Sequence, residues 1–69
     1  MKNEIIFYIE ESLDGGFEAQ APGYSIYTCG DTIEDLKENI RGAVHCHFEE
    51  SDAPQIIRLH FVKEEAIAL

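Results

Sequence analysis

The segment from residue 30 to residue 44 constrains the fold most, because its pattern predicts a single capped, amphipathic helix. Either Asp31 or Thr32 can serve as the N-cap, with an acidic residue three positions further on, as in a capping box. The apolar side chains that follow recur at the helical period and form one stripe: Ile33, Leu36, Ile40, Ala43, Val44 and Phe48. We therefore expect a helix that begins at this cap and fades over residues 49–51, ahead of Pro54.

Three β-strands are predicted before this helix and one after it. Alternating apolar residues, or β-branched and aromatic residues, mark them at residues 5–10, 17–21, 24–29 and 56–62. Asp14, Gly15 and Gly16 predict a hairpin turn between the first two strands, because Asp and Gly tolerate a positive φ. Gly30 ends the third strand, and residues 63–69 are expected to be either a helical turn or a frayed tail.

These elements predict an α+β fold with the order β-β-β-α-β, in which one helix covers one face of an antiparallel sheet. Residues 1–69 then form a single domain, and a chain of this length buries only about 60% of its unfolded surface. The uncovered face of the sheet would still carry apolar side chains, namely Ile6, Tyr8, Ile56 and Val62. One helix cannot cover both faces of a sheet. Self-association as a homodimer or homotetramer is therefore expected.

The charge of the chain is strongly one-sided. Fourteen acidic residues face five basic ones, which gives a net charge of -9. Binding of nucleic acid depends on Lys and Arg that neutralise phosphates, so direct nucleic-acid binding is disfavoured. A basic protein partner would be attracted, although such charge can also serve only to keep a protein soluble. Two cysteines, with no signal peptide and no long apolar run, favour a cytoplasmic protein that does not enter membranes.

The residues His45, Cys46 and His47, taken with Cys29 and His60, suggest a metal or catalytic site. Neighbouring side chains on a helix point in different directions, so they cannot converge on one metal ion. Neither cysteine has a recognisable base and orienting group, so we expect no catalytic residues, no cofactor and no enzymatic activity. Both cysteines are predicted to be small buried side chains, and His47 is predicted at the edge of the core, packed on the sheet or at a subunit contact. An enzyme that uses Cys46 with His45 or His47 is the alternative.

One family resemblance rests on three sequence features: Gly-Gly-Phe-Glu-Ala at residues 15–19, Pro22, and Gly-Asp-Thr-Ile-Glu-Asp-Leu-Lys-Glu-Asn-Ile-Arg-Gly-Ala-Val at residues 30–44. On these features, the chain resembles the HicB-like antitoxin family over about residues 4–50. The family's usual Pro-Asp-Leu-Pro-Gly segment is replaced here by residues 22–27. The chain resembles a short, single-domain branch, and because it stops at Leu69 we expect no C-terminal DNA-binding module.

The resemblance implies a partial ribonuclease-H-like fold without that fold's catalytic acids. It also implies a partner, a small basic HicA-type toxin that cleaves mRNA and that HicB proteins neutralise by covering its active site. From charge and expected exposure, the toxin would contact the acidic hairpin region and nearby tyrosines: Glu10, Glu11, Asp14, Glu18, Tyr24 and Tyr27. The alternative is a homo-oligomeric regulatory or small-ligand module without a toxin. Its ligand would sit between subunits, because one small chain has little room for a pocket of about 300 Å3.

Overall fold

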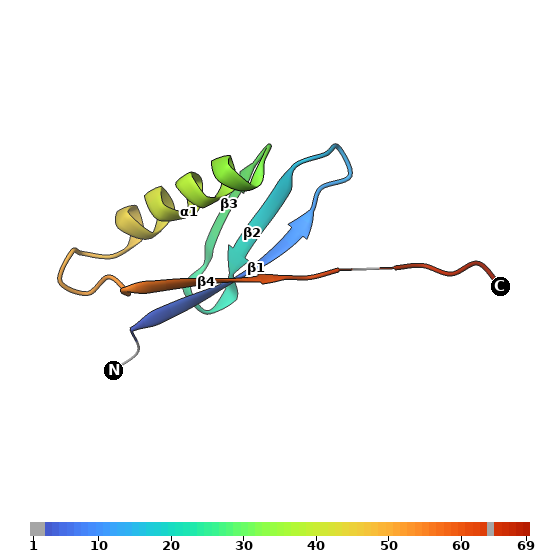
Figure 1. The fold of residues 1–69 in the computed structure, drawn as a ribbon. Coiled ribbons are helices and arrows are strands. Elements are labelled where there is room, and N and C mark those ends of the chain that lie inside the picture. The colour runs from blue at the N-terminus through green and yellow to red at the C-terminus, as the bar shows by residue number, and fades with distance from the viewer. Residues whose placement is uncertain (1–2, 64) are drawn as a thin grey trace.

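The computed structural model describes residues 3–63 and 65–69, which form one four-stranded sheet with a helix on one face (Figure 1). The elements, in chain order, are β1 (Glu4–Glu11), β2 (Phe17–Ala21), the short 3-10 helix η1 (Pro22–Tyr24), β3 (Ile26–Gly30), α1 (Ile33–His47) and β4 (Ile56–Phe61). The strands lie in the order β3-β2-β1-β4. The predicted α+β class and the predicted order of strands and helix are confirmed.

The sheet is mixed, and the expectation of an antiparallel sheet was wrong. β1 pairs antiparallel with β2, and β2 antiparallel with β3, but β4 runs parallel to β1. The reason is that α1 carries the chain back along the sheet before β4 begins. A helical crossover of this kind is what joins parallel strands, whereas a hairpin joins antiparallel ones. The crossover also takes the chain from one edge of the sheet, β3, to the other edge, β4.

The hydrophobic core lies between α1 and the sheet face that it covers. Alternate residues of β1 point into it, as the sequence pattern predicted, and so does part of the apolar stripe of α1. The nine buried core residues are Ile5, Phe7, Ile9, Ala19, Ala21, Ile26, Leu36, Ile40 and Val44. Nearly all of the fully buried volume therefore comes from one face of β1 and one stripe of α1.

The helix begins as predicted and ends slightly earlier than predicted. Thr32 is its N-cap, since the backbone N–H of Asp35 donates to Thr32 Oγ1 at 3.1 Å. The helix ends at His47, because Phe48 adopts an extended backbone while its N–H still donates to the carbonyl of Val44. The expectation that helix would persist to residues 49–51 was wrong. The ring of Phe48 instead packs beside the helix end.

The third strand begins later than the sequence pattern suggested. Residues 22–24 form η1 and Ser25 has a positive φ of 56°, so regular pairing starts only at Ile26. Pro22 explains the interruption, because it lacks an N–H for the strand ladder. At the other end of the molecule, the described residues 63 and 65–69 form neither helix nor strand and extend away from the body (Figure 1). No helical turn is seen there, and Glu64 lies outside the described residues.

Candidate functional site

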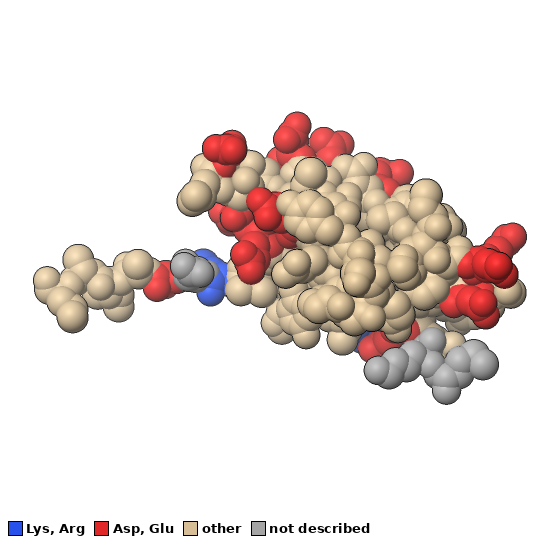
Figure 2. All heavy atoms as spheres, turned by 180° about the vertical axis from the view of Figure 1, so that it is seen from behind, with Lys and Arg blue, Asp and Glu red and all other residues tan. Residues whose placement is uncertain are grey.

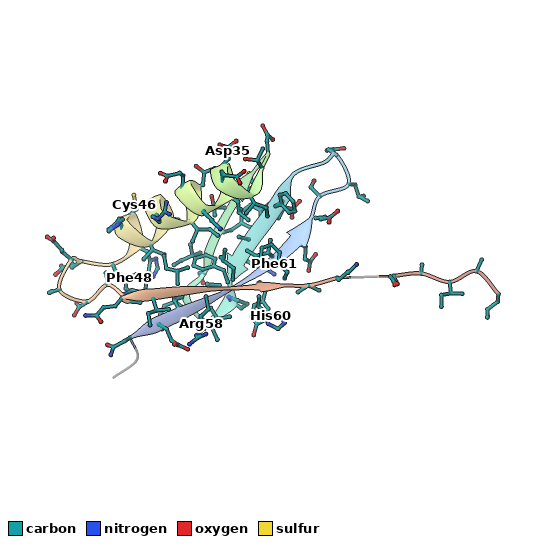
Figure 3. The ribbon with its side chains drawn as sticks, viewed as in Figure 1. Asp35, Cys46, Phe48, Arg58, His60 and Phe61 are labelled. Atoms are coloured by element: carbon teal, nitrogen blue, oxygen red, sulfur yellow. The ribbon has the colours of Figure 1, made fainter. Side chains whose placement is uncertain are left out.

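The face of the sheet opposite α1 is uncovered, and it carries the most distinctive group of polar and aromatic side chains. The strand alternation that buries Ile5, Phe7 and Ile9 turns their neighbours to this open face. The exposed apolar residues predicted there are confirmed: Ile6 (43% exposed), Tyr8 (41%), Ile56 (48%) and Val62 (42%). Figure 3 shows Arg58 and His60 on the side of β4 away from α1, on this same face.

The strand register sets these side chains in rows across the open face. Tyr8 is paired with Gln20 on one side and with His60 on the other, and Gln20 is paired with Tyr27. A row of Tyr27, Gln20, Tyr8 and His60 therefore crosses all four strands. The rings of Tyr8 and His60 meet edge to face, with centroids 5.4 Å apart. Gln20 was not assigned to a site from the sequence, Tyr8 was placed only among the apolar residues of the uncovered face, and His60 was considered only as part of a metal or catalytic site. The alternation of the strands nevertheless placed all three on the open face.

Next to this row, two carboxylates lie directly opposite each other. Glu10 of β1 is paired with Glu18 of β2, and Glu18 is paired with Cys29 of β3. Like charges in facing positions on neighbouring strands are destabilising. Among the described residues, the ion pairs are Glu38 with Arg41 and Glu4 with Arg58, and neither involves this pair of carboxylates. The negative charge of the pair is thus available to a partner.

Tyr27 borders the acidic pair and is 60% exposed. Its phenol pKa is raised above the ordinary value of 10.0, first by partial desolvation and then by the negative charge of Glu18. The phenol is therefore neutral over the physiological pH range and can donate a hydrogen bond. The hollow at this point holds about 50 Å3. That volume is far below the several hundred Å3 of a small-molecule site, so the geometry suits a protein surface.

The six predicted contact residues are only partly brought together. Glu10, Glu18 and Tyr27 lie side by side on the open face, at the hollow just described. Glu11 alternates with Glu10 and so belongs to the other face, and Asp14 lies in the hairpin loop. The structure thus brings together fewer acidic residues than the sequence predicted, and Tyr8 and Gln20 line the same hollow.

Tyr24 lies away from this cluster, at the far end of β2. Its ring packs against Phe48, with centroids 5.3 Å apart, and against His47 at 6.2 Å. A wide groove of about 630 Å3 is lined by Tyr24 together with Ile6 and Tyr8. The expectation that one chain has little room for a pocket was therefore wrong. This groove forms because η1 turns the chain away from the sheet and leaves space beside β1.

Comparison with known proteins identifies relatives along almost the whole chain. A UPF0150 protein of Thermotoga maritima is 47% identical over 68 residues, which cover 99% of this chain and 96% of that protein. The chain belongs to the UPF0150 family. A UPF0150 protein of Archaeoglobus fulgidus is 46% identical over 52 residues, covering 75% of this chain and 77% of the relative. No family model and no solved structure gave a significant match.

The cysteines and histidines of this UPF0150 chain are dispersed. Cys29 is on β3 and His60 on β4, the two opposite edges of the sheet, while His45 and Cys46 lie near the end of α1. Within residues 3–63 and 65–69, no three His, Cys, Asp or Glu side chains are placed to hold a metal ion. Both cysteines are exposed, so the prediction that they are buried was wrong. Cys29 follows the open-face alternation of β3, and Cys46 lies off the apolar stripe of α1.

His47 is also exposed, although the apolar stripe of α1 placed it at the edge of the core. Its ring stacks edge to face on Phe48, with centroids 4.8 Å apart. The helix ends here, and the sheet beneath its last turn is replaced by η1, so the core does not reach this residue.

In the described part of the chain, no helix is both long and apolar enough to cross a membrane.

Proposed function

We propose that this protein is a non-catalytic, cytoplasmic binding module of the HicB-like antitoxin kind, which neutralises a small basic ribonuclease toxin of the HicA type. The resemblance of residues 15–19 and 30–44 to that family supports the assignment. The strand order β3-β2-β1-β4 with a helix on one face agrees with a partial ribonuclease-H-like fold. The observation that carries the proposal is the facing pair Glu10 and Glu18, which lies on the exposed sheet without a described basic partner.

The proposed mechanism is one of charge pairing and steric cover. Lysine and arginine side chains of the toxin meet Glu10 and Glu18, which relieves the repulsion between the two carboxylates. Tyr27 contributes an exposed aromatic ring at the edge of this contact, a residue type that is enriched at protein interfaces. Basic residues that a ribonuclease needs for its RNA substrate are then occupied by protein carboxylates. No group of the antitoxin has to react for the toxin to be silenced.

The distribution of charge over the surface supports long-range attraction of a basic partner. Figure 2 shows Asp and Glu side chains along the upper edge and at both ends of the body, around a central area without charged residues. Only five basic residues balance fourteen acidic ones in the whole chain. Such a field raises the rate of association with a protein of opposite charge, and added salt weakens it.

The test is a charge reversal on the open face. The double substitution Glu10→Lys and Glu18→Lys should slow association with a HicA-type toxin by at least about ten-fold and reduce protection of RNA from cleavage. The matched control is Glu49→Lys with Glu50→Lys, which makes the same change of charge in the exposed loop after α1. Equal effects of the two double variants would show that net charge acts without a defined contact. Unchanged binding by the open-face variant would refute the proposal.

A second candidate function is a homo-oligomeric module without a toxin partner. It is favoured by the exposed apolar residues Ile6, Tyr8, Ile56 and Val62, which line the same open face. This second function is also supported by the groove of about 630 Å3 beside Tyr24, which is large enough for a small ligand. In this case the open face is buried between copies, and the toxin has no effect on the size of the assembly. Size exclusion with mass detection, with and without the toxin, separates the two functions.

A further inference from the structure

An unfilled groove with an apolar floor and a basic rim runs between α1 and β4, on the side of the sheet that the helix covers. α1 packs on β3 and reaches β2, so little lies above the side chains that β4 turns to this side. A hollow of about 390 Å3 is lined by Lys37, Ile40, Arg41, Ile57 and Leu59. A second hollow of about 430 Å3 shares Arg41 and Ile57 with the first and continues toward Pro54. The two hollows form one groove alongside β4.

The floor of the groove is an apolar strip on β4. Ile57 and Leu59 are only half-buried, and Phe61, which shares their face by strand alternation, is 53% exposed. Figure 3 shows Phe61 on the α1 side of β4, opposite to Arg58 and His60. On β1, the neighbouring strand, Phe7 is 0% exposed. The same sheet face is thus closed over β1 and open over β4.

The C-terminal segment, residues 65–69, has the complementary feature, which is apolar side chains without cover. Ile67 is 89% exposed and Leu69 is 123% exposed. The segment extends away from the body (Figure 1), and the molecule measures 51 Å along its longest axis against 23 and 17 Å along the others. In an extended chain Ile67 and Leu69 point to the same side, so they can enter one groove together. The seven residues after Val62 can reach about 23 Å from the body.

The segment is poorly built to fill the groove of its own chain. Val62 continues the direction of β4, since its N–H donates to the carbonyl of Ile9 at 2.8 Å. The groove runs back alongside β4, so the chain would have to reverse direction directly after this residue. Residues 62–65 are Val, Lys, Glu and Glu, and none of these is a residue that favours tight turns.

The charges of the groove and the segment are complementary. Lys37 and Arg41 border the groove and are two of the five basic residues in a chain with a net charge of -9. Arg41 pairs with Glu38, whereas Lys37 takes part in none of the ion pairs among the described residues. Glu65 directly precedes the apolar residues 66–69. A segment that lays Ile67 and Leu69 into the groove therefore brings a carboxylate close to its basic rim.

We propose that two copies of this chain exchange their C-terminal segments, each laying Ile67 and Leu69 on Ile57, Leu59 and Phe61 of its partner. A reciprocal exchange about a two-fold axis is self-complementary and closes at the dimer. The exchange fills the groove of both copies, and the same residues make the contact in each copy. The exchange uses the helix side of the sheet, so it leaves the open face free and does not depend on toxin binding.

The first test compares self-association of three full-length proteins by sedimentation over a range of concentrations. The wild type should dimerise, and Ile67→Asp with Leu69→Asp should raise the dimer dissociation constant by at least about 100-fold. The control Leu13→Asp also removes an exposed apolar side chain, 106% exposed in the hairpin loop, and should dimerise as the wild type does. A wild type that stays monomeric, or a segment variant that dimerises normally, overturns the proposal. A dimer that is lost only on changing Tyr8 or Ile6 assigns the interface to the open face and also overturns it.

The second test fixes the position of the segment directly. In a background with Cys29→Ser and Cys46→Ser, one isotope-labelled chain carries Leu69→Cys and an unlabelled chain carries Lys37→Cys. Oxidation of the mixture should give a disulfide between the labelled and the unlabelled chain. The proposal is overturned if a chain that carries both new cysteines forms the bond within a monomer, or if the mixture forms no bond between the two kinds of chain. The charge pairing is tested by Lys37→Glu, which should weaken the dimer. Combining Lys37→Glu with Glu65→Lys in one chain should restore the dimer.

Discussion

The two edge strands of the sheet differ sharply in how they are covered. At β3, the side-chain amide of Asn39 on α1 donates to the carbonyl of Cys29 at 2.7 Å, and the backbone at Gly30 lies against the start of the helix. At β4, a groove separates the strand from α1, and Phe61 is half exposed. The helix therefore covers the edge strand β3. It leaves the apolar side chains of β4, the other edge strand, free to contact a partner. An uncovered edge strand invites pairing with another chain, which makes this asymmetry relevant to assembly.

The largest expected effect is on stability, and it compares a residue packed between α1 and the sheet with a residue beside the groove at β4. Leu36→Ala removes a side chain of α1 that faces the sheet and is 0% exposed, and it should lower the free energy of unfolding by about 3 kcal/mol. Phe61→Ala removes a larger side chain from the groove, yet it should cost less than about 1 kcal/mol in the monomer. Urea unfolding followed by circular dichroism, at a concentration where the chain is monomeric, measures both. Similar losses would mean that β4 is packed as tightly as β3.

The next effect tests the close contact between β3 and α1. A Cβ atom added at Gly30 would lie 2.5 Å from the backbone nitrogen of Leu36, so Gly30→Ala should push the helix away at a cost of about 2 kcal/mol. The control is Gly42→Ala, since a Cβ there meets nothing within 4 Å and Ala favours helix by about 1 kcal/mol. Opposite signs for these two changes in urea unfolding are expected. A neutral Gly30→Ala would show that the helix can shift freely over the sheet.

The sequence pattern predicted most of the fold because its elements are locally encoded. Alternation in β1 and the helical period of α1 identified the buried faces, and Thr32 was one of two predicted caps. The direction of β4 was missed because periodicity identifies the faces of a strand but not its orientation relative to its neighbours. Gly30 was recognised only as the end of a strand. Its steric role depends on the approach of a helix, which no local pattern reports.

The candidate site was predicted only in part, because it depends on register between strands. Glu10 and Glu18 were both named from their charge, but their facing positions follow from the pairing of β1 with β2. Tyr24 was grouped with Tyr27 because both were expected to be exposed near the acidic hairpin, but the turn at η1 separates them. The cysteines were assigned to the core by residue type alone. Their exposure follows from the alternation of β3 and from the position of Cys46 off the apolar stripe of α1. These periodic patterns predict burial better than residue type does.

A smaller effect tests the cap that holds the helix start beside β3. Thr32→Ala removes the acceptor of the hydrogen bond from the Asp35 N–H and should lower the free energy of unfolding by about 1 kcal/mol. Thr32→Ser keeps the hydroxyl and should retain most of the stability. Thermal and urea unfolding at one fixed chain concentration give both values. If the serine variant lost as much as the alanine variant, the methyl group of Thr32 rather than its hydroxyl would carry the effect.

The smallest effect probes the open face through the ionisation of Tyr27. Its phenol pKa lies above 10.0 because of partial desolvation first and the charge of Glu18 second. Glu18→Gln should therefore lower this pKa toward its ordinary value without fully restoring it, since the desolvation remains. Ultraviolet titration of the phenolate, in a chain with Tyr8→Phe and Tyr24→Phe, follows this one group.

The sign of the linked stability follows from the direction of the shift. A pKa that is raised on folding means that the neutral phenol is favoured in the folded chain, so its contribution is fully present below pH 10. The contribution is lost as the pH rises through the raised pKa of the folded state. Glu10→Gln is the matched control, because Glu10 is not among the causes of the shift and its removal should leave the pKa of Tyr27 in place. If both variants moved the pKa equally, the effect would come from the net charge of the acidic cluster. A shift with Glu18→Gln alone would place that carboxylate beside the Tyr27 phenol, as expected for diagonal neighbours on β2 and β3 that line one hollow.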